Sequence, residues 1–120
     1  MTKQLSFSKY ENALLPEFRQ KINHAESEED LKKFFAYTAK ELFENVFAGK
    51  IAFEYGDVAF RPGNDPHYQV SERLLAKEDF KIIWNDSDLP HVMARFARPT
   101  VNRLRHLAKH PEKTDAKIRM

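Results

Sequence analysis

The chain has 120 residues, of which 42% are hydrophobic and 32% are charged, and it contains no Cys. This length and mixture are typical of one folded globular domain over residues 1–120, and the absence of Cys excludes disulfide frameworks, thiolate metal sites and cysteine nucleophiles. The net charge of +2 is unevenly distributed along the chain. Residues 1–90 hold 12 Lys and Arg against 16 Asp and Glu, a balance of −4, whereas residues 91–120 hold 8 against 2, a balance of +6. An anionic partner would satisfy this asymmetry, and so would a basic helix folded back on an acidic one.

Two helices are predicted at the N-terminus. Ser8 followed by Glu11 has the spacing of a capping box, and the helix that follows either kinks at Pro16 or starts near it. Ser27 precedes three acidic residues and predicts the start of a second helix over 28–47, which Gly49 ends. We expect this second helix to be the central core element, with its apolar positions buried: Leu31, Phe34, Phe35, Leu42, Val46 and Phe47.

The pattern then changes from helical to alternating. Apolar residues alternate with small or polar ones through 51–60, around a turn at Gly56-Asp57, which predicts a β-hairpin with Phe53 facing Phe60. Residues 68–75 are ambiguous between strand and short helix. The segment 80–84 is predicted as a strand with Phe80 and Trp84 on one face.

A long basic helix is predicted after the polar run 85–88, which supplies its N-terminal cap. Pro99 lies inside this helix, so we expect a kink or a break there, and we expect a frayed tail over 112–120. The fold class is therefore α+β: two N-terminal helices and a kinked, basic C-terminal helix pack on an antiparallel sheet of three or four strands.

The basic helix carries the clearest functional pattern. Polar and basic residues recur at spacings of three, four, three and four, which places them in one stripe of a helix: Arg95, Arg98, Asn102, Arg105 and Lys109. A row of guanidinium groups can contact the phosphates of DNA or RNA. The alternatives are a solvated face, or pairing with the acidic run 26–30.

The segment 88–109 also resembles a DNA-binding helix-turn-helix in its length and in its small and apolar residues, Met93, Ala94, Ala97, Leu104 and Leu107. That resemblance implies a turn inside the segment. The turn of this motif wants Gly followed by an aliphatic residue, whereas this chain has Arg98 and Pro99.

A second candidate site is the loop 61–67, where Arg61, Asp65 and His67 stand on irregular backbone. His67 and Asp65 would form a base and its orienting carboxylate, and Arg61 would bind an anionic substrate. The same residues are also common turn-formers. His106 and His110 have metal-ligand spacing, but two imidazoles do not complete a zinc site, and we expect neither metal nor cofactor.

These patterns favour a small cytoplasmic binding or adaptor protein whose basic helix meets nucleic acid or an acidic protein surface. The alternative is a small enzyme or ligand-binding protein that uses the 61–67 loop. No membrane association is expected, because the longest uncharged stretch near the second helix, 34–39, is far too short to span a bilayer. A homodimer is the prior for a small domain this rich in Phe.

Overall fold

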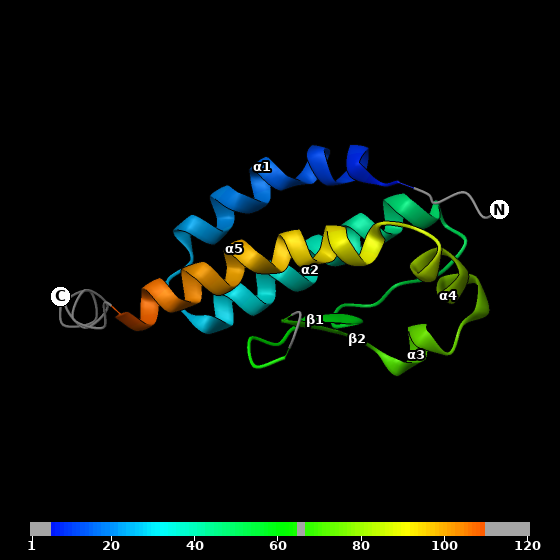
Figure 1. Ribbon diagram of the computed structural model, residues 1–120. Helices are drawn as coiled ribbons and strands as arrows, with labels where there is room; N and C mark the ends of the chain where they lie inside the picture. The colour runs from blue at the N-terminus through cyan, green and yellow to red at the C-terminus, as the bar shows by residue number, and fades with distance from the viewer. Residues whose placement is uncertain (1–5, 65–66, 110–120) are drawn as a thin grey trace.

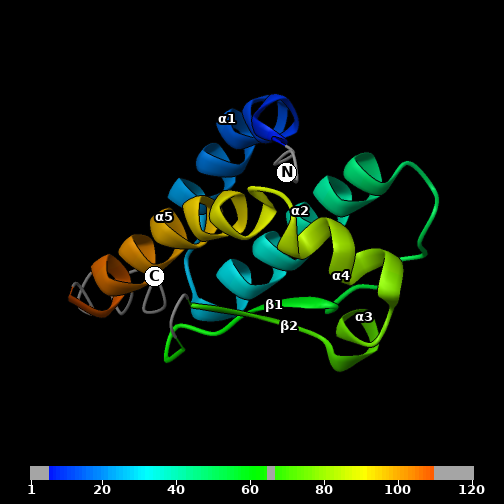
Figure 2. The same cartoon turned by 45° about the vertical axis from the view of Figure 1, so that its right-hand side comes forward.

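The computed structural model describes residues 6–64 and 67–109. Its elements are α1 (Ser8–His24), α2 (Glu28–Phe47), β1 (Val58–Phe60), β2 (Tyr68–Val70), α3 (Glu72–Leu75), α4 (Glu78–Asn85) and α5 (Leu89–Lys109). The three long helices α1, α2 and α5 run side by side, and α3 and α4 lie together at one end of the molecule (Figure 1). Turned by 45°, the view shows the short β1–β2 ribbon beneath α2 (Figure 2). The described residues thus form a mixed fold of helices and a small antiparallel two-stranded sheet, which agrees with the predicted α+β class.

The start of α1 differs from the prediction. Ser8 is the first helical residue and not the cap, and the N-cap position, Phe7, makes no side-chain cap hydrogen bond. Glu11 is buried, so its carboxylate serves a contact with another element instead of a capping box. The helix does not start near Pro16, because it begins at Ser8 and runs through this proline; the alternative, a kink at Pro16, stays a prediction.

The predicted second helix is confirmed as α2. The Ser27 hydroxyl accepts a hydrogen bond from the Asp30 N–H at 3.1 Å, as expected of an N-cap. The helix ends one residue earlier than Gly49 suggests, because Ala48 itself takes the left-handed conformation, with a φ of 51°. Of the six apolar positions expected in the core, four are buried and Phe34 and Val46 are partly buried.

Phe35 lies at the centre of the core. Its ring packs against Phe18 of α1, Phe60 of β1 and Tyr68 of β2, with centroid distances from 5.8 to 6.5 Å. A second aromatic group joins α2 to α4, and its rings are Phe43, Phe47, Phe53, Phe80 and Trp84. The Tyr68–Trp84 contact, at 6.2 Å, connects the two groups.

The predicted hairpin at 51–60 is wrong, and so is the sheet of three or four strands. In the described residues β1 pairs with β2 in an antiparallel ladder, with Val58 opposite Val70 and Phe60 opposite Tyr68. The turn before β1 forms one residue earlier than predicted, at Tyr55-Gly56, where the Asp57 N–H donates to the Glu54 carbonyl at 3.1 Å, and residues 51–54 before it are irregular. Phe53 packs on the α2 aromatic rings instead of facing Phe60, and burial in that group outweighs the pairing that the alternation suggested.

Asp57 holds this irregular segment in place. Its buried carboxylate accepts hydrogen bonds from the Glu54 N–H at 2.7 Å and from the Ser71 hydroxyl at 2.9 Å, and it forms an ion pair with Arg73. Arg73 also donates to the Ala52 carbonyl at 3.2 Å. One carboxylate therefore ties the turn to the start of α3.

The segment 68–75 is a strand followed by a helical turn, which resolves its ambiguity: Ser71 caps α3 by accepting a hydrogen bond from the Leu74 N–H. The strand predicted over 80–84 is wrong, because these residues form α4. In a helix the core face is Phe80, Ile83 and Trp84, at spacings of three and four, whereas Ile82 is half exposed.

The predicted break at Pro99 is not found, because α5 continues through Pro99 as one helix, and nothing in the structure supports the predicted kink. This continuity also removes the helix-turn-helix resemblance, which needs a turn within the segment. The predicted frayed tail, 112–120, lies outside the described residues. The start of α5 is well anchored, since Asp88 accepts hydrogen bonds from the Phe7 N–H at 2.8 Å and from the Ser6 hydroxyl at 3.0 Å.

Candidate functional site

The outer side of α5 is the strongest candidate site. The helix contains five Lys and Arg and no Asp or Glu over 21 residues, and an α-helix of that length extends for about 31 Å. Its inner side is fixed in the core by Leu89, Val92, Met93, Phe96 and Val101, all buried. The basic residues therefore lie on a helix whose rotation is set by packing.

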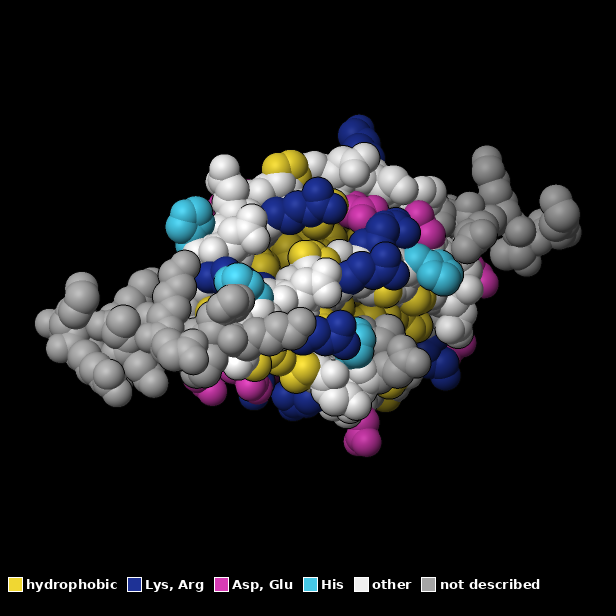
Figure 3. All heavy atoms as spheres, turned by 60° about the vertical axis from the view of Figure 1, so that its left-hand side comes forward, with side chains coloured by type: hydrophobic (Ala, Val, Ile, Leu, Met, Phe, Trp, Pro, Cys, Tyr) yellow, Lys and Arg dark blue, Asp and Glu magenta, His cyan; other side chains and the backbone are white. Residues whose placement is uncertain are grey.

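The residues of the predicted basic stripe are mostly exposed to solvent. Arg98, Asn102 and Arg105 are exposed, and Arg95 is about half exposed at 47% of its side chain. The side chain of Lys109 lies outside the part of the chain that the structure describes. In the space-filling view, Lys and Arg side chains run across the middle of this face, while Asp and Glu gather at its upper right and lower edge (Figure 3).

Arg95 has an internal partner that the sequence did not reveal. Its Nε and a terminal nitrogen donate to the two carboxylate oxygens of Glu11 at 2.7 and 2.8 Å, and the Glu11 side chain is only 6% exposed. The hydrogen bonds to Glu11 raise the pKa of Arg95, so this guanidinium stays charged. Arg95 thus neutralises a buried carboxylate, and Arg98 and Arg105 are the exposed cations of the stripe with described side chains.

Arg103 lies off the stripe and has a structural contact. Its guanidinium donates twice to the Ala25 carbonyl, at 3.2 and 2.9 Å, which fixes the second half of α5 to the α1–α2 connection. The acidic run nearby has local partners: Glu28 pairs with Lys32 at 3.1 Å, and the Asp30 carboxylate accepts from the Glu26 N–H at 3.1 Å. Two of its carboxylates are therefore engaged at the start of α2.

The 61–67 loop is built as a turn. The Arg61 N–H donates to the His67 carbonyl at 2.8 Å, and His67 takes a positive φ of 77°. The His67 ring nitrogen Nδ1 lies 3.0 Å from the Pro62 carbonyl oxygen, and Arg61 Nε lies 3.4 Å from the Gln69 side-chain oxygen. Asp65 lies outside the described residues. Both described members of the proposed site thus contact their own loop and strand.

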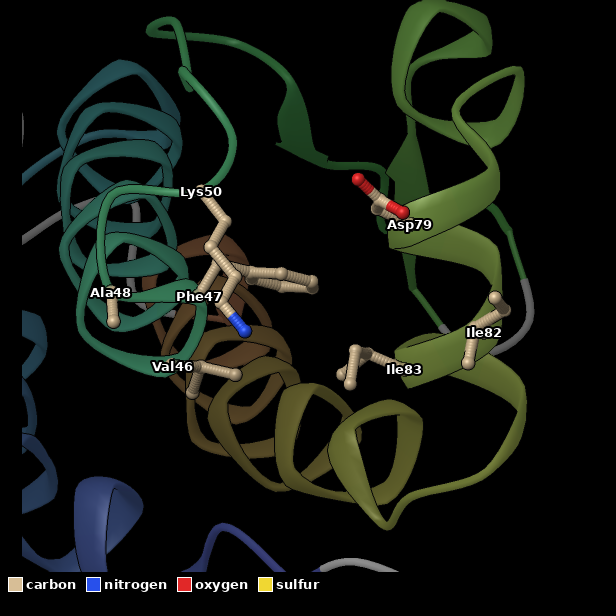
Figure 4. A pocket seen from close by; sticks show the side chains of 7 residues that line it. All are labelled: Val46, Phe47, Ala48, Lys50, Asp79, Ile82 and Ile83. Carbon is tan, nitrogen blue, oxygen red and sulfur yellow. The ribbon is translucent and has the colours of Figure 1, made fainter.

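A cleft lies between the end of α2 and α4, with a volume of about 360 Å³. Val46 and Phe47 form one wall and Ile82 and Ile83 the other (Figure 4). Lys50 reaches into it from the loop after α2, and Asp79 stands on the α4 side. Sequence reasoning missed this cleft because it assigned α4 as a strand; the spacing of Phe80, Ile83 and Trp84 was the available signal.

A metal-ligand cluster and a membrane-spanning helix are both absent from the described residues. Within residues 6–64 and 67–109, no three His, Asp or Glu side chains come together as metal ligands, and His110, the partner of His106 in the sequence pattern, lies outside this range. No helix in the described part of the chain is long and apolar enough to cross a membrane. Comparisons with protein families, with curated proteins and with solved structures find no match to this chain.

Proposed function

We propose that this chain is a small cytoplasmic nucleic-acid-binding or adaptor protein that contacts phosphates through the outer side of α5. The observation that supports this proposal is the absence of any acidic residue on a 21-residue helix whose exposed side carries Arg98 and Arg105. Guanidinium groups on a packed helix meet phosphate oxygens with little loss of conformational freedom, because the backbone is already fixed.

Nucleic acid is favoured over an acidic protein surface by what α5 lacks. Protein interfaces have an apolar and aromatic centre, whereas nucleic-acid interfaces are polar and strongly positive. Among the described residues, the exposed large hydrophobic side chains are Tyr10, Tyr37, Tyr55, Leu75 and Ile82, and none of them belongs to α5. The outer side of this helix therefore offers exposed charge without a large, fully exposed hydrophobic side chain among its described residues.

The test is a titration of mixed-sequence duplex DNA and RNA, followed by fluorescence anisotropy at several salt concentrations. Each phosphate contact contributes about −0.9 to the slope of log K against log salt on duplex DNA. Arg98→Glu combined with Arg105→Glu should therefore abolish binding at moderate salt, and any residual slope should be shallower by about 1.8.

The matched control is Lys33→Glu with Lys81→Glu, which changes the net charge equally at exposed positions outside α5. This control should keep most of the affinity. Wild type that does not bind at low salt, or a control that loses as much affinity as the α5 variant, would remove the nucleic-acid proposal. An acidic protein surface would then be the partner to test.

A further inference from the structure

The α3–α4 side of the molecule carries the exposed aliphatic surface of the described residues. Leu75 of α3 is 41% exposed and Ile82 of α4 is 50% exposed, whereas the other large exposed hydrophobic side chains are tyrosines, which have a polar end. Ile82 forms part of the wall of the α2–α4 cleft. An aliphatic side chain that protrudes beside an apolar cleft is typical of a protein contact surface.

The α2–α4 cleft has the size and the apolar lining to receive an aliphatic side chain such as that of Ile82. Most of its lining is apolar, from Val46, Phe47, Ile82 and Ile83, and its volume of about 360 Å³ is large enough for an aliphatic side chain. Ile82 is such a side chain. This surface therefore provides both an exposed aliphatic side chain, Ile82, and a hollow large enough to receive one from a partner.

The charges at the cleft are also complementary to each other. Lys50 comes from the loop after α2, and Asp79 lies in the first turn of α4, on the opposite side of the cleft (Figure 4). Both are exposed, and neither makes an ion pair with any residue that the structure describes. A second, more polar hollow of about 330 Å³ shares both residues, so they stand at the middle of a longer groove.

We propose that this groove binds a second copy of the chain in a two-fold dimer. In such a contact the same patch meets itself, so that residue i of one copy contacts residue j of the other and j contacts i. Ile82 of each copy enters the cleft of its partner, and Lys50 of each copy pairs with Asp79 of the other. A second copy supplies an exposed aliphatic side chain, an apolar hollow and both charges, which are the elements that a self-complementary contact needs.

This contact leaves the proposed nucleic-acid surface uncovered. α4 and the end of α2, whose residues line the cleft, lie at one end of the molecule, and the second half of α5 lies at the other (Figure 1). Dimerisation and nucleic-acid binding are therefore separate properties, and each is measured without the other.

The experiment measures mass in solution by sedimentation equilibrium at concentrations up to about 1 mM, which detects affinities down to the millimolar range. Wild type should form a reversible dimer. Lys50→Glu alone places two acidic residues opposite each other at both ends of the two-fold contact, and Asp79→Lys alone places two cations there. Each single variant should weaken the dimer by more than about tenfold.

The decisive arm mixes the two single variants. In a two-fold contact, Glu at position 50 of one chain meets Lys at position 79 of the other, and the unchanged Asp79 and Lys50 form the second pair. The equimolar mixture should therefore form a heterodimer, and Lys50→Glu with Asp79→Lys in one chain should restore the homodimer. Ile82→Glu should be monomeric in every combination.

The control is Lys33→Glu with Glu41→Lys on α2, which exchanges two exposed charges outside the groove and should leave the dimer unchanged. Far-UV circular dichroism of each variant shows that a monomer is a folded monomer. Wild type that is monomeric at the highest concentration overturns the proposal. So does a mixture of the two single variants that stays monomeric while each variant is folded.

Discussion

Asp57 shows how one buried carboxylate holds an irregular segment. Burial alone would raise the pKa of this group, but hydrogen bonds from Arg73, from the Glu54 N–H and from Ser71, together with the charge of Arg73, outweigh burial and lower the pKa below its ordinary value of 3.8. In the unfolded chain these partners are gone, so the unfolded state binds a proton at higher pH than the folded state does. Asp57 therefore stabilises the fold above its unfolded pKa, and this contribution is lost as the pH falls through the lowered, folded pKa.

Asp57→Ala should lower the free energy of unfolding at pH 7 by about 2–4 kcal/mol, because it leaves the Glu54 N–H and the Arg73 guanidinium without their acceptor. Urea denaturation at pH 7 and below pH 4 is the measurement. The deficit relative to wild type should shrink at the acidic end, since wild type loses the Asp57 contribution there. Glu41→Ala, at an exposed position on α2, should change the urea midpoint little. An equal effect of both variants would contradict the stabilising role of the Asp57 carboxylate.

At the scale of the element, α2 supplies the centre of the core through Phe35. Phe35→Ala should destabilise the protein by about 3–5 kcal/mol, because the ring is 1% exposed and its removal leaves a cavity between α1, α2 and the sheet. Tyr37→Ala is the control on the same helix, two residues away and 53% exposed, and should cost less than about 1.5 kcal/mol. Chemical denaturation checks both, and similar losses would contradict the assignment of the core face.

The elements that the sequence predicts well are those whose pattern has a single interpretation. In α2 the cap at Ser27 and five turns of helical period agree, and the helix forms as expected. The segment 80–84 fits both a period of two and a helical spacing, because Phe80, Ile82, Ile83 and Trp84 are all apolar. The competition is decided by packing against the rings of α2, which a local pattern does not contain.

At the scale of the whole molecule, the Glu11–Arg95 pair joins two helices whose contacting residues are 84 positions apart. Arg95→Met should destabilise the protein by about 1–3 kcal/mol, less than for a fully buried pair because the guanidinium is half exposed. Adding Glu11→Leu should recover most of this loss, since it removes the buried charge that Arg95→Met leaves uncompensated. Thermal unfolding of the two single variants and the double variant measures the coupling.

Arg98→Met is the control for this pair, because it removes an exposed guanidinium from the same helix and should change stability by no more than about 0.5 kcal/mol. A double variant less stable than Arg95→Met alone would contradict the interpretation of Glu11 as a carboxylate held in the core by its partner.

Long-range contacts also explain how much of the candidate site could be predicted. The spacing of Arg95, Arg98, Asn102 and Arg105 is local, so the sequence predicts their common side of the helix. The ion pair between Glu11 and Arg95, and the placement of Lys50 and Asp79 on opposite sides of the α2–α4 cleft, depend on which helices pack together. The hydrophobic period of the sequence does not show which helices pack against one another.

The position of α5 has a consequence for the order in which the protein forms during synthesis. Among the helices that the structure describes, α5 comes last along the chain, yet it packs against α1, α2, α4 and β2 and supplies Phe96, whose ring lies 5.1 Å from that of Phe18. A chain emerging from the ribosome cannot complete its core until residues up to Val101 are available. Until then Phe18, Ile22 and the Glu11 carboxylate lack the surface that covers them, so final assembly waits for α5.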